Sequence, residues 1–268
     1  MDRERTERPM EPGLVQSVDR AARILELLSE QPAMGVSEVS RELGVHRSTA
    51  FRLLATLEAR NLVEQVDVRG DYRLGLGVLR MAGALTARSD LTRDAQACCD
   101  EMAGRLNETM NVSIFDADAA VTITQASGDQ MIGVARQYVG QRVPLHATST
   151  GKLLLAHAGL SEQQRVLTAP LERFTASTIV EPAQLAAELE RVRERGWATA
   201  VAEWEEGTNA VAVPVRGAGG AVIAALSVTA PSYRLPESGF EDVVAALREG
   251  ADDLGARSGY LRPESAAH

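Results

Sequence analysis

Between residues 33 and 60, apolar side chains recur at the spacing of two buried helix faces, and Gly44 separates the two patterns. Ser37 lies where the side-chain oxygen of an N-cap would accept hydrogen bonds from the first backbone N–H groups of the first helix. The first face comprises Val36, Val39, Ser40 and Leu43. The second helix starts near Arg47, and the side chains it is predicted to bury are Ala50, Phe51, Leu53, Leu54 and Leu57. Because only about three or four residues separate the two helices, the pattern predicts a helix-turn-helix.

The start of the second predicted helix is polar and basic. Its candidate contact residues are His46, Arg47, Ser48, Thr49 and Arg52, to which we add Ser37 from the first helix. An arginine side chain can fork onto guanine or onto a phosphate group, and serine and threonine hydroxyl groups can take either role. We therefore interpret the two helices as a DNA-binding element. Two amphipathic helices joined at a glycine also occur in ordinary helical domains, and the helices alone leave that alternative open.

The segment after these helices favours DNA binding. Residues 62–66 and 72–74 are short strand-like runs, and Gly70 between them supports a hairpin. A hairpin directly after a recognition helix is a wing, so the sequence predicts a winged helix. Arg69 at the tip and Arg73 on the return strand are predicted to reach the flanking DNA backbone or minor groove.

Earlier and later residues complete the predicted organisation. Ser17 is expected to cap the first helix of the DNA-binding head. Residues 76–86 are apolar enough for a helix that lies against a second subunit, although burial within its own subunit is an equal alternative. The predicted divisions are a disordered tail at 1–13, a winged helix-turn-helix domain at 14–75, a linker helix at 76–90, a mixed α/β domain at 91–256 and a second tail at 257–268.

The second half of the chain alternates helical and strand-like patterns. Strands are predicted at residues 111–115, 120–125, 197–201, 209–215 and 221–229, the last two joined by a tight hairpin at 217–220. Helices are predicted at residues 91–106, in the later part of 146–159, at 182–195 with Gly196 as its end, and from 237 to about 254. This order predicts an α+β domain built on one central sheet.

The formal net charge of −9 argues at first against a nucleic-acid partner. Residues 1–88 hold 13 arginines and 13 acidic residues, whereas residues 89–268 hold 15 basic and 24 acidic residues. The whole deficit lies in the second half, which would repel DNA. We therefore expect only the first half to touch DNA, through a small basic surface.

Two further features limit the class of protein. The N-terminal sequence is charged rather than typical of a signal peptide, and no run of 18 or more apolar residues occurs, so we expect a cytoplasmic protein with no membrane partner. The only cysteines, Cys98 and Cys99, are neighbours and lack the spacing of a disulfide framework or a metal site. We predict no metal and no cofactor.

One segment has the chemistry of an anion site. Residues 146–152 read HATSTGK and lead into the N-terminus of a helix, where backbone N–H groups and hydroxyl groups gather. That arrangement suits a carboxylate, and an ordinary capped helix is the competing explanation. A phosphate-binding loop is excluded, because Gly140 is too far upstream and Leu153 replaces the serine or threonine that would hold magnesium.

Two groups of residues look catalytic but lack the context of an active site. His146, Ser149 and Lys152 could be drawn as a nucleophile with helpers, yet no G-x-S-x-G elbow surrounds the serine. Glu203, Glu205 and Glu206 could be drawn as an acid and base pair, but the run WEEG at residues 204–207 is interpreted as a solvated loop that leads into a strand. We predict that the protein is not an enzyme.

Longer motifs occur in a fixed order along the chain: SVDRAARILELL, HRSTAFRLLATLE, YRLGLGVL, PLHATSTGKLLLA, LERVRERGWA, EEGTNAVAVPV and AALSVTAP. From about residue 14 to residue 254 they resemble IclR-type transcriptional regulators. The resemblance implies a winged-helix head, a linker helix and a GAF-like α/β sensor domain. It also implies a homodimer that often pairs into a homotetramer, and control of a nearby catabolic operon by a small metabolite, often a carboxylic acid.

The resemblance further implies an effector pocket. Carried over to this sequence, its residues would be Ser149, Thr150 and the adjacent Gly151, then Ala200, Ala210, Ser227 and Thr229, with Ile132 and Ala135 as an apolar wall. Ala200 stands where some relatives have an acidic side chain, which argues against a ligand that needs a hydrogen-bond acceptor at that point. The hydroxyl groups of Ser149 and Thr150 favour a small ligand with several acceptors over an aromatic one.

We therefore expect a repressor of a catabolic operon that binds double-stranded operator DNA as a homodimer or as a dimer of dimers. A small organic acid is the expected effector. The same architecture fits a transcriptional activator, and no feature of the sequence distinguishes a repressor from an activator. From other classes, a small-molecule hydrolase and a DNA-free sensing module are the alternatives.

Overall fold

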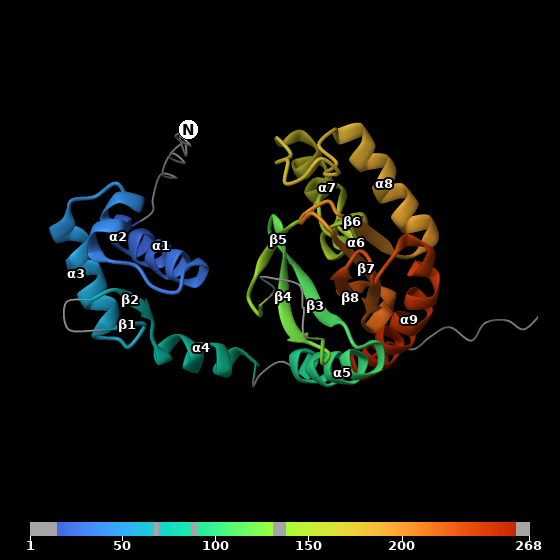
Figure 1. Cartoon of the computed structure of the whole chain (residues 1–268), viewed down its shortest axis with the longest axis horizontal. Coiled ribbons are helices and arrows are strands. Elements are labelled where there is room, and N and C mark those ends of the chain that lie inside the picture. The colour runs from blue at the N-terminus through green and yellow to red at the C-terminus, as the bar shows by residue number, and fades with distance from the viewer. Residues whose placement is uncertain (1–14, 67–69, 87–89, 131–137, 261–268) are drawn as a thin grey trace, which may run out of the picture. The chain divides into compact units, whose positions relative to one another are not determined.

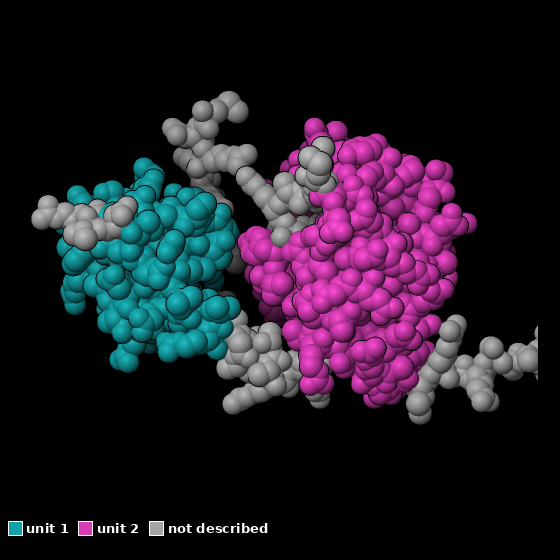
Figure 2. Space-filling view, turned by 60° about the horizontal axis from the view of Figure 1, so that its bottom comes forward, with its two compact units in different colours: residues 1–88 teal, residues 89–268 magenta. Residues whose placement is uncertain are grey.

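The computed structural model describes residues 15–66, 70–86, 90–130 and 138–260. The chain divides into two units, residues 1–88 and residues 89–268, which are coloured separately in Figure 2. The first unit carries three helices followed by a hairpin and a fourth helix. The second carries one sheet with helices on both of its faces (Figure 1). The predicted α+β class with an N-terminal winged helix-turn-helix is confirmed. No helix in the described ranges combines the length and the apolar character needed to cross a membrane.

The first unit is built around the helices α1 (Gln16–Glu30), α2 (Val36–Glu42) and α3 (Arg47–Glu58). Between α2 and α3, Gly44 has a φ of 61°, a left-handed conformation that glycine adopts without steric cost, so the chain turns within a few residues. The hairpin pairs β1 (Val63–Gln65) with β2 (Tyr72–Leu74) and adds a bridge from Met34 to Tyr72. The small core joins these elements through side chains that include Ile24, Val39, Leu54 and Tyr72.

Three local predictions in this unit are wrong. Helix α2 is capped by Gly35 rather than Ser37, because the Glu38 carboxylate accepts from the Gly35 N–H at 2.9 Å and closes the first turn. Helix α1 starts after Val15, so Ser17 lies within the helix instead of capping it. Phe51 is 53% exposed, although it was expected to be buried.

Helix α4 (Leu76–Thr86) follows the wing, as the pattern predicted. Its first two turns expose large apolar side chains: Leu76, Leu79 and Met81 are 71%, 68% and 63% exposed. Within the described residues of the chain, these side chains have no apolar cover, which a helix normally obtains by packing against another element.

The second unit contains a six-stranded antiparallel sheet in the order β5-β4-β3-β8-β7-β6. The strands are β3 (Thr109–Asp116), β4 (Ala119–Ala126), β5 (Arg142–Pro144), β6 (Ala198–Val201), β7 (Thr208–Arg216) and β8 (Val222–Pro231). The helices are α5 (Asp90–Leu106), α6 (Ser149–His157), α7 (Leu160–Thr168), α8 (Pro182–Arg195) and α9 (Phe240–Arg257). The hairpin that links β7 to β8 and the end of α8 at Gly196, where φ is 76°, are as predicted.

The two faces of this sheet carry different side chains. Helices α5 and α9 cover one face (Figure 1), where Val211, Val213, Leu226 and Val228 belong to a continuous apolar core. Successive strand residues point to opposite faces, so the positions between them face helix α6. That second face packs against α6, on which α8 lies in turn, through alanines such as Ala212 and Ala225, and elsewhere it presents small polar side chains.

Three elements of this unit differ from the predicted pattern. Strand β5 (Arg142–Pro144) was not among the predicted strands. Helix α7 was not predicted; it has only three large apolar side chains, of which Leu160 is exposed and Val166 and Leu167 are half-buried against the core. The last helix begins at Phe240, and a 3-10 turn occupies Glu237–Gly239, where the helix was expected to start.

Candidate functional site

The outward face of α3 forms a candidate DNA interface. Arg47 and Arg52 are exposed, and neither guanidinium group makes an ion pair with a described residue. Four residues make one turn of helix, so Arg47, Ser48, Phe51 and Arg52 project from the same side. Ala50, Leu54 and Leu57 occupy the opposite, buried side. The arrangement places two free positive charges and one aromatic ring on a surface that can enter a major groove.

Neighbouring candidate residues have more specific local roles. His46 is the N-cap of α3, and its Nδ1 atom lies 2.9 Å from the Ser48 Oγ atom. Thr49 is half-buried, and Ser37 is exposed on α2. These contacts fix the start of the recognition helix and leave its arginines to face solvent.

The wing supplies one further basic side chain. Arg73 lies opposite Glu64 in the hairpin register, and its guanidinium group contacts the Glu64 carboxylate at 2.7 Å. Both side chains are exposed, so solvent screens this pair strongly. Arg69, the predicted tip residue, lies outside the described residues.

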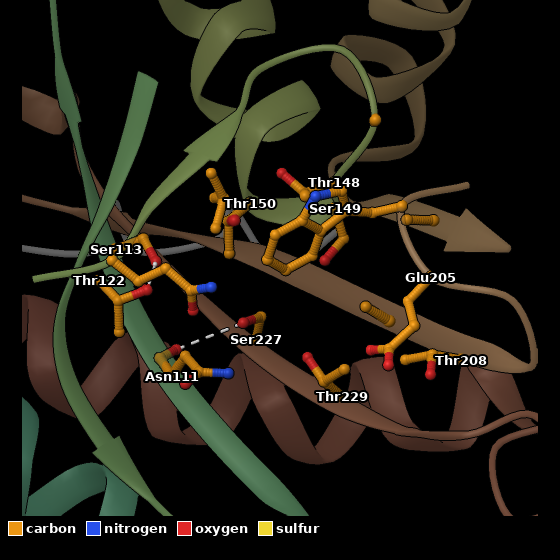
Figure 3. Close-up of a pocket in the computed structure, with 16 residues that line it drawn as sticks. Asn111, Ser113, Thr122, Thr148, Ser149, Thr150, Glu205, Thr208, Ser227 and Thr229 are labelled. Carbon is orange, nitrogen blue, oxygen red and sulfur yellow. Dashed lines mark hydrogen bonds between the residues drawn. The ribbon is translucent and has the colours of Figure 1, made fainter. Parts of the chain in front are cut away.

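A cavity lies on the polar face of the sheet, under the N-terminus of α6 (Figure 3). Its empty volume is about 530 Å³, which includes the part open to solvent. The sheet provides its floor through Asn111, Ser113, Thr122, Ala200, Thr208, Ala210, Ser227 and Thr229. The remaining lining residues are Gln141, Val143, Ala147, Thr148, Ser149, Thr150, Trp204 and Glu205.

Several hydroxyl groups face the cavity with their hydrogen-bonding capacity unused. Ser149, Thr150 and Thr229 are 2%, 6% and 5% exposed, and none of their hydroxyl groups has a hydrogen-bond partner among the described residues. Burying a polar group without a partner is unfavourable, so this set is prepared for a ligand or for water. Thr148 is the N-cap of α6, and its Oγ1 atom accepts from the Gly151 N–H at 3.1 Å. The preceding Ser149 and Thr150 N–H groups have no acceptor within the helix.

The structure brings together most of the expected effector-pocket residues. Six of them line the cavity: Ser149, Thr150, Ala200, Ala210, Ser227 and Thr229. Gly151 does not, because it faces β5; an added Cβ atom there would lie 2.5 Å from the Pro144 carbonyl oxygen. Ile132 and Ala135, the expected apolar wall, lie outside the described residues.

Sequence reasoning missed the polar positions contributed by β3 and β4. Asn111, Ser113 and Thr122 are almost fully buried and line the same cavity. They were included in predicted strands but had no assigned role. Their signal was a run of polar residues at alternate strand positions, beside buried apolar residues such as Met110 and Val112.

Glu203, which directly precedes the predicted solvated loop at residues 204–207, is buried. This side chain lies within the protein, and its Oε1 atom is 2.6 Å from the Nζ atom of Lys152, which is 1% exposed. Burial raises the pKa of the Glu203 carboxyl group, and the Lys152 ammonium group offsets part of that effect. Glu205 lines the cavity, while Glu206 is exposed as expected.

His146, Ser149 and Lys152, which the sequence suggested as a possible catalytic set, do not hydrogen-bond to one another. The Nε2 atom of His146 is 2.9 Å from the Glu172 carbonyl oxygen, and Lys152 is paired with Glu203. Neither His146 nor Lys152 is a hydrogen-bond partner of Ser149, so neither is placed to activate that hydroxyl group.

Comparisons with known proteins match both units to one family. Residues 17–67 match the model described as IclR helix-turn-helix domain, and residues 83–256 match that of Bacterial transcriptional regulator IclR C-terminal. The chain is 30% identical to the Escherichia coli regulator XynR, over 92% of this chain and 98% of that protein. It is 32% identical to the Escherichia coli repressor AllR, over 91% and 90%.

Solved structures give the same result. An IclR-type regulator from Alicyclobacillus acidocaldarius superimposes with a TM-score of 0.81 at 29% identity, covering 92% of this chain and all of that one. An IclR homologue from Microbacterium hydrocarbonoxydans, solved with 4-hydroxybenzoate, gives a TM-score of 0.78 at 27% identity, covering 91% and 99%.

The buried ion pair leads to a prediction about stability. Lys152→Met should lower the free energy of unfolding of the second unit by about 3 to 5 kcal/mol, because it leaves the Glu203 carboxylate buried without its partner. The double variant Lys152→Met with Glu203→Met should recover most of that loss. Urea unfolding followed by circular dichroism measures both changes.

The matched control is Arg105→Met, which breaks an exposed ion pair with Glu249 of the same 2.6 Å length in the same unit. Its effect should stay below about 1 kcal/mol. Equal losses for Lys152→Met and Arg105→Met would show that the buried pair has no special structural role.

Proposed function

This chain belongs to the IclR family of bacterial transcriptional regulators, and we propose that it is a repressor of a catabolic operon controlled by a small carboxylate. The winged helix-turn-helix binds double-stranded operator DNA, and the cavity beneath α6 binds the effector. Family members are regulators rather than enzymes. The observation that carries the effector proposal is the cluster of buried, unpartnered hydroxyl groups at the N-terminus of α6.

The geometry of α3 supports the DNA part of the proposal. Arg47 and Arg52 are exposed and unpaired within the described chain, so binding a phosphate or a guanine edge breaks no existing ion pair. The acidic residues that give the chain its net charge of −9 lie in excess only in residues 89–268. Electrostatic attraction to DNA is therefore confined to the first unit.

The cavity supports a carboxylate effector. Its N–H groups at the start of α6 and its hydroxyl groups can donate to carboxylate oxygens, and the helix dipole favours negative charge at that end. The Microbacterium relative was solved with 4-hydroxybenzoate, which is itself a carboxylate. For this chain we propose the carboxylate group as the shared feature rather than the aromatic ring.

The assignment as a repressor and the proposed dimer are supported by different observations. AllR, at 32% identity, is named as a repressor, and we assign the same sign here. The exposed apolar side chains Leu76, Leu79 and Met81 on α4 suit a contact with a second copy of the chain. A dimer that presents two recognition helices would read a palindromic site, and two such dimers would form the proposed tetramer.

Phe51 extends the proposed DNA interface. Its ring is 53% exposed, one helical turn from Arg47 and next to Arg52. An exposed ring of this size gains little from solvent, whereas in a major groove it can pack against the methyl group of thymine. We propose that Phe51 reads a thymine while the arginines hold guanine or phosphate.

For the arginines, Arg52→Ala should weaken binding by about 1 to 3 kcal/mol if the side chain reads a base. A smaller, sequence-independent loss with a shallower salt dependence is expected if it holds a phosphate. The measurement is fluorescence anisotropy on DNA selected from a random library by the full-length protein. Arg191→Ala, which removes the same charge from the second unit, is the control, and unchanged affinity for Arg52→Ala would exclude this residue from the interface.

For Phe51, the selected DNA is scanned by replacing each thymine with uracil, which removes only the 5-methyl group. At one position in each half-site the wild-type protein should lose about 0.8 kcal/mol, roughly fourfold in affinity. Phe51→Ala should show no loss at that position. Identical uracil profiles for both proteins would rule out thymine reading by Phe51.

For the cavity, Ser227→Ala combined with Thr229→Val should leave DNA affinity unchanged and abolish the response to effector. The reason is that both side chains lie in the cavity floor, in the second unit, while the DNA contacts lie in the first. A screen of small carboxylic acids by thermal shift identifies ligands of the wild-type protein, since a ligand that binds only the folded state raises its melting temperature. Persistence of the shift and of DNA release in the double variant would contradict the proposed pocket.

A further inference from the structure

Glu205 is the only acidic side chain among the described residues that line the cavity. Figure 3 shows it beside Thr208, on the side of the cavity away from Ser113 and Thr122. No described residue donates a hydrogen bond to its carboxylate group. A carboxylate on the wall of a site for an anion repels the ligand unless the ligand places a donor against it.

The position of Glu205 is set by the fold rather than by a free loop. Glu203, two residues earlier, is tied to Lys152 in α6. The Thr178 hydroxyl group donates to the Glu203 carbonyl oxygen at 2.6 Å, and the Thr175 hydroxyl group donates to the adjacent Ala202 carbonyl oxygen at 2.6 Å. On the other side of Glu205, the Thr208 N–H donates to the Glu205 carbonyl oxygen at 3.3 Å. The backbone on both sides of Glu205 is therefore anchored, and the Glu205 side chain lines the cavity.

The remaining lining residues divide the cavity by chemistry. The N-terminus of α6, with Ser149 and Thr150, offers donors and positive dipole potential. Glu205 offers two acceptor oxygens and a negative charge. Among the described lining residues no arginine or lysine is present to neutralise it. A ligand that satisfies both regions has a carboxylate group at one end and a hydrogen-bond donor at the other.

We propose that Glu205 selects effectors that carry a hydroxyl, amino or ureido group remote from the carboxylate, and excludes simple monocarboxylates and dicarboxylates. This inference rests on the proposed carboxylate effector and names its chemical class. It also modifies the expectation drawn from Ala200: the acceptor missing at that strand position is supplied by Glu205 from the adjacent loop. A hydrogen bond to a charged acceptor is stronger than one between neutral groups, which makes this contact a strong filter.

The test compares matched acids that differ in the donor. The pairs are 3-hydroxybutanoate with butanoate, 4-hydroxybenzoate with benzoate, and 3-ureidopropanoate with 5-methylhexanoate. Isothermal titration calorimetry on the full-length protein should show at least one donor-bearing acid binding about 10- to 100-fold more tightly than its partner. Succinate should bind no more tightly than butanoate.

Glu205→Gln keeps the shape of the side chain and removes its charge, so it tests whether the charge of Glu205 selects the ligand. In this variant the preference for the donor-bearing acid should fall to about fivefold or less, while butanoate and succinate should bind at least as tightly as to wild type. A residue with only a structural role would weaken all of the acids together. The control is Glu206→Gln, which removes the same charge from the exposed neighbour outside the cavity lining and should leave every preference unchanged.

The outcomes distinguish the two proposals. If acids bind but each donor-bearing acid and its partner bind equally, or if Glu205→Gln retains the wild-type preference, the role of Glu205 is refuted and the carboxylate effector stands. If no acid of either kind binds the wild-type protein, the proposed carboxylate effector is itself contradicted, and the inference about Glu205 fails with it.

Discussion

The buried contact between Lys152 and Glu203 connects the two parts of the second unit on which the cavity depends. Lys152 lies in the first turn of α6, whose N-terminus faces the cavity, and Glu203 lies in the loop after β6 that also provides Glu205. Both side chains are almost completely buried, so the ion pair repays their desolvation only while its geometry is kept. The Thr175 and Thr178 hydroxyl groups hold the backbone of the same loop. The ion pair and these hydrogen bonds together thus set the position of the helix N-terminus relative to the acidic wall.

The central sheet makes room for the cavity through the alternation of its strands. In β8, Leu226 and Val228 point into the core with α5 and α9, while Ser227 and Thr229 point into the cavity. The neighbouring positions are equally small: Ala210 pairs with Thr229, and Asn111 pairs with Ser227. A large apolar side chain at any of these positions would fill the space beneath α6. The polar face of the sheet therefore buries less apolar surface than the opposite face. On that opposite face, the continuous core with α5 and α9 supplies most of the apolar packing.

Local patterns predicted most of the elements, and they failed where the outcome depended on distant contacts. Helix α8 was predicted with its exact bounds because Pro182 and Gly196 mark its ends. Phe51 was assigned to the buried face because an apolar residue fits the helical period, yet the angular position it shares with Arg47 and Arg52 directs it outward. The environment of Glu203 could not be predicted locally, since its partner lies 51 residues away along the chain. The pocket residues on β7, β8 and α6 followed from the family resemblance, whereas Asn111 and Ser113 require knowledge of which strands are neighbours.

The distribution of charge determines how such a regulator can respond to its effector. Because the acidic excess lies entirely in residues 89–268, the unit that holds the cavity gains no net electrostatic attraction to DNA. Under the proposed function, regulation then appears as a coupling free energy, typically about 1 to 3 kcal/mol, between two separate sites. A ligand supplies this energy only by binding two arrangements of the protein with different affinity. Within the second unit, a ligand in the cavity would contact the N-terminus of α6 and the Glu205 loop, which the buried Lys152–Glu203 pair joins. Such a ligand shifts the equilibrium only as far as it binds one arrangement of the whole protein more tightly than the other.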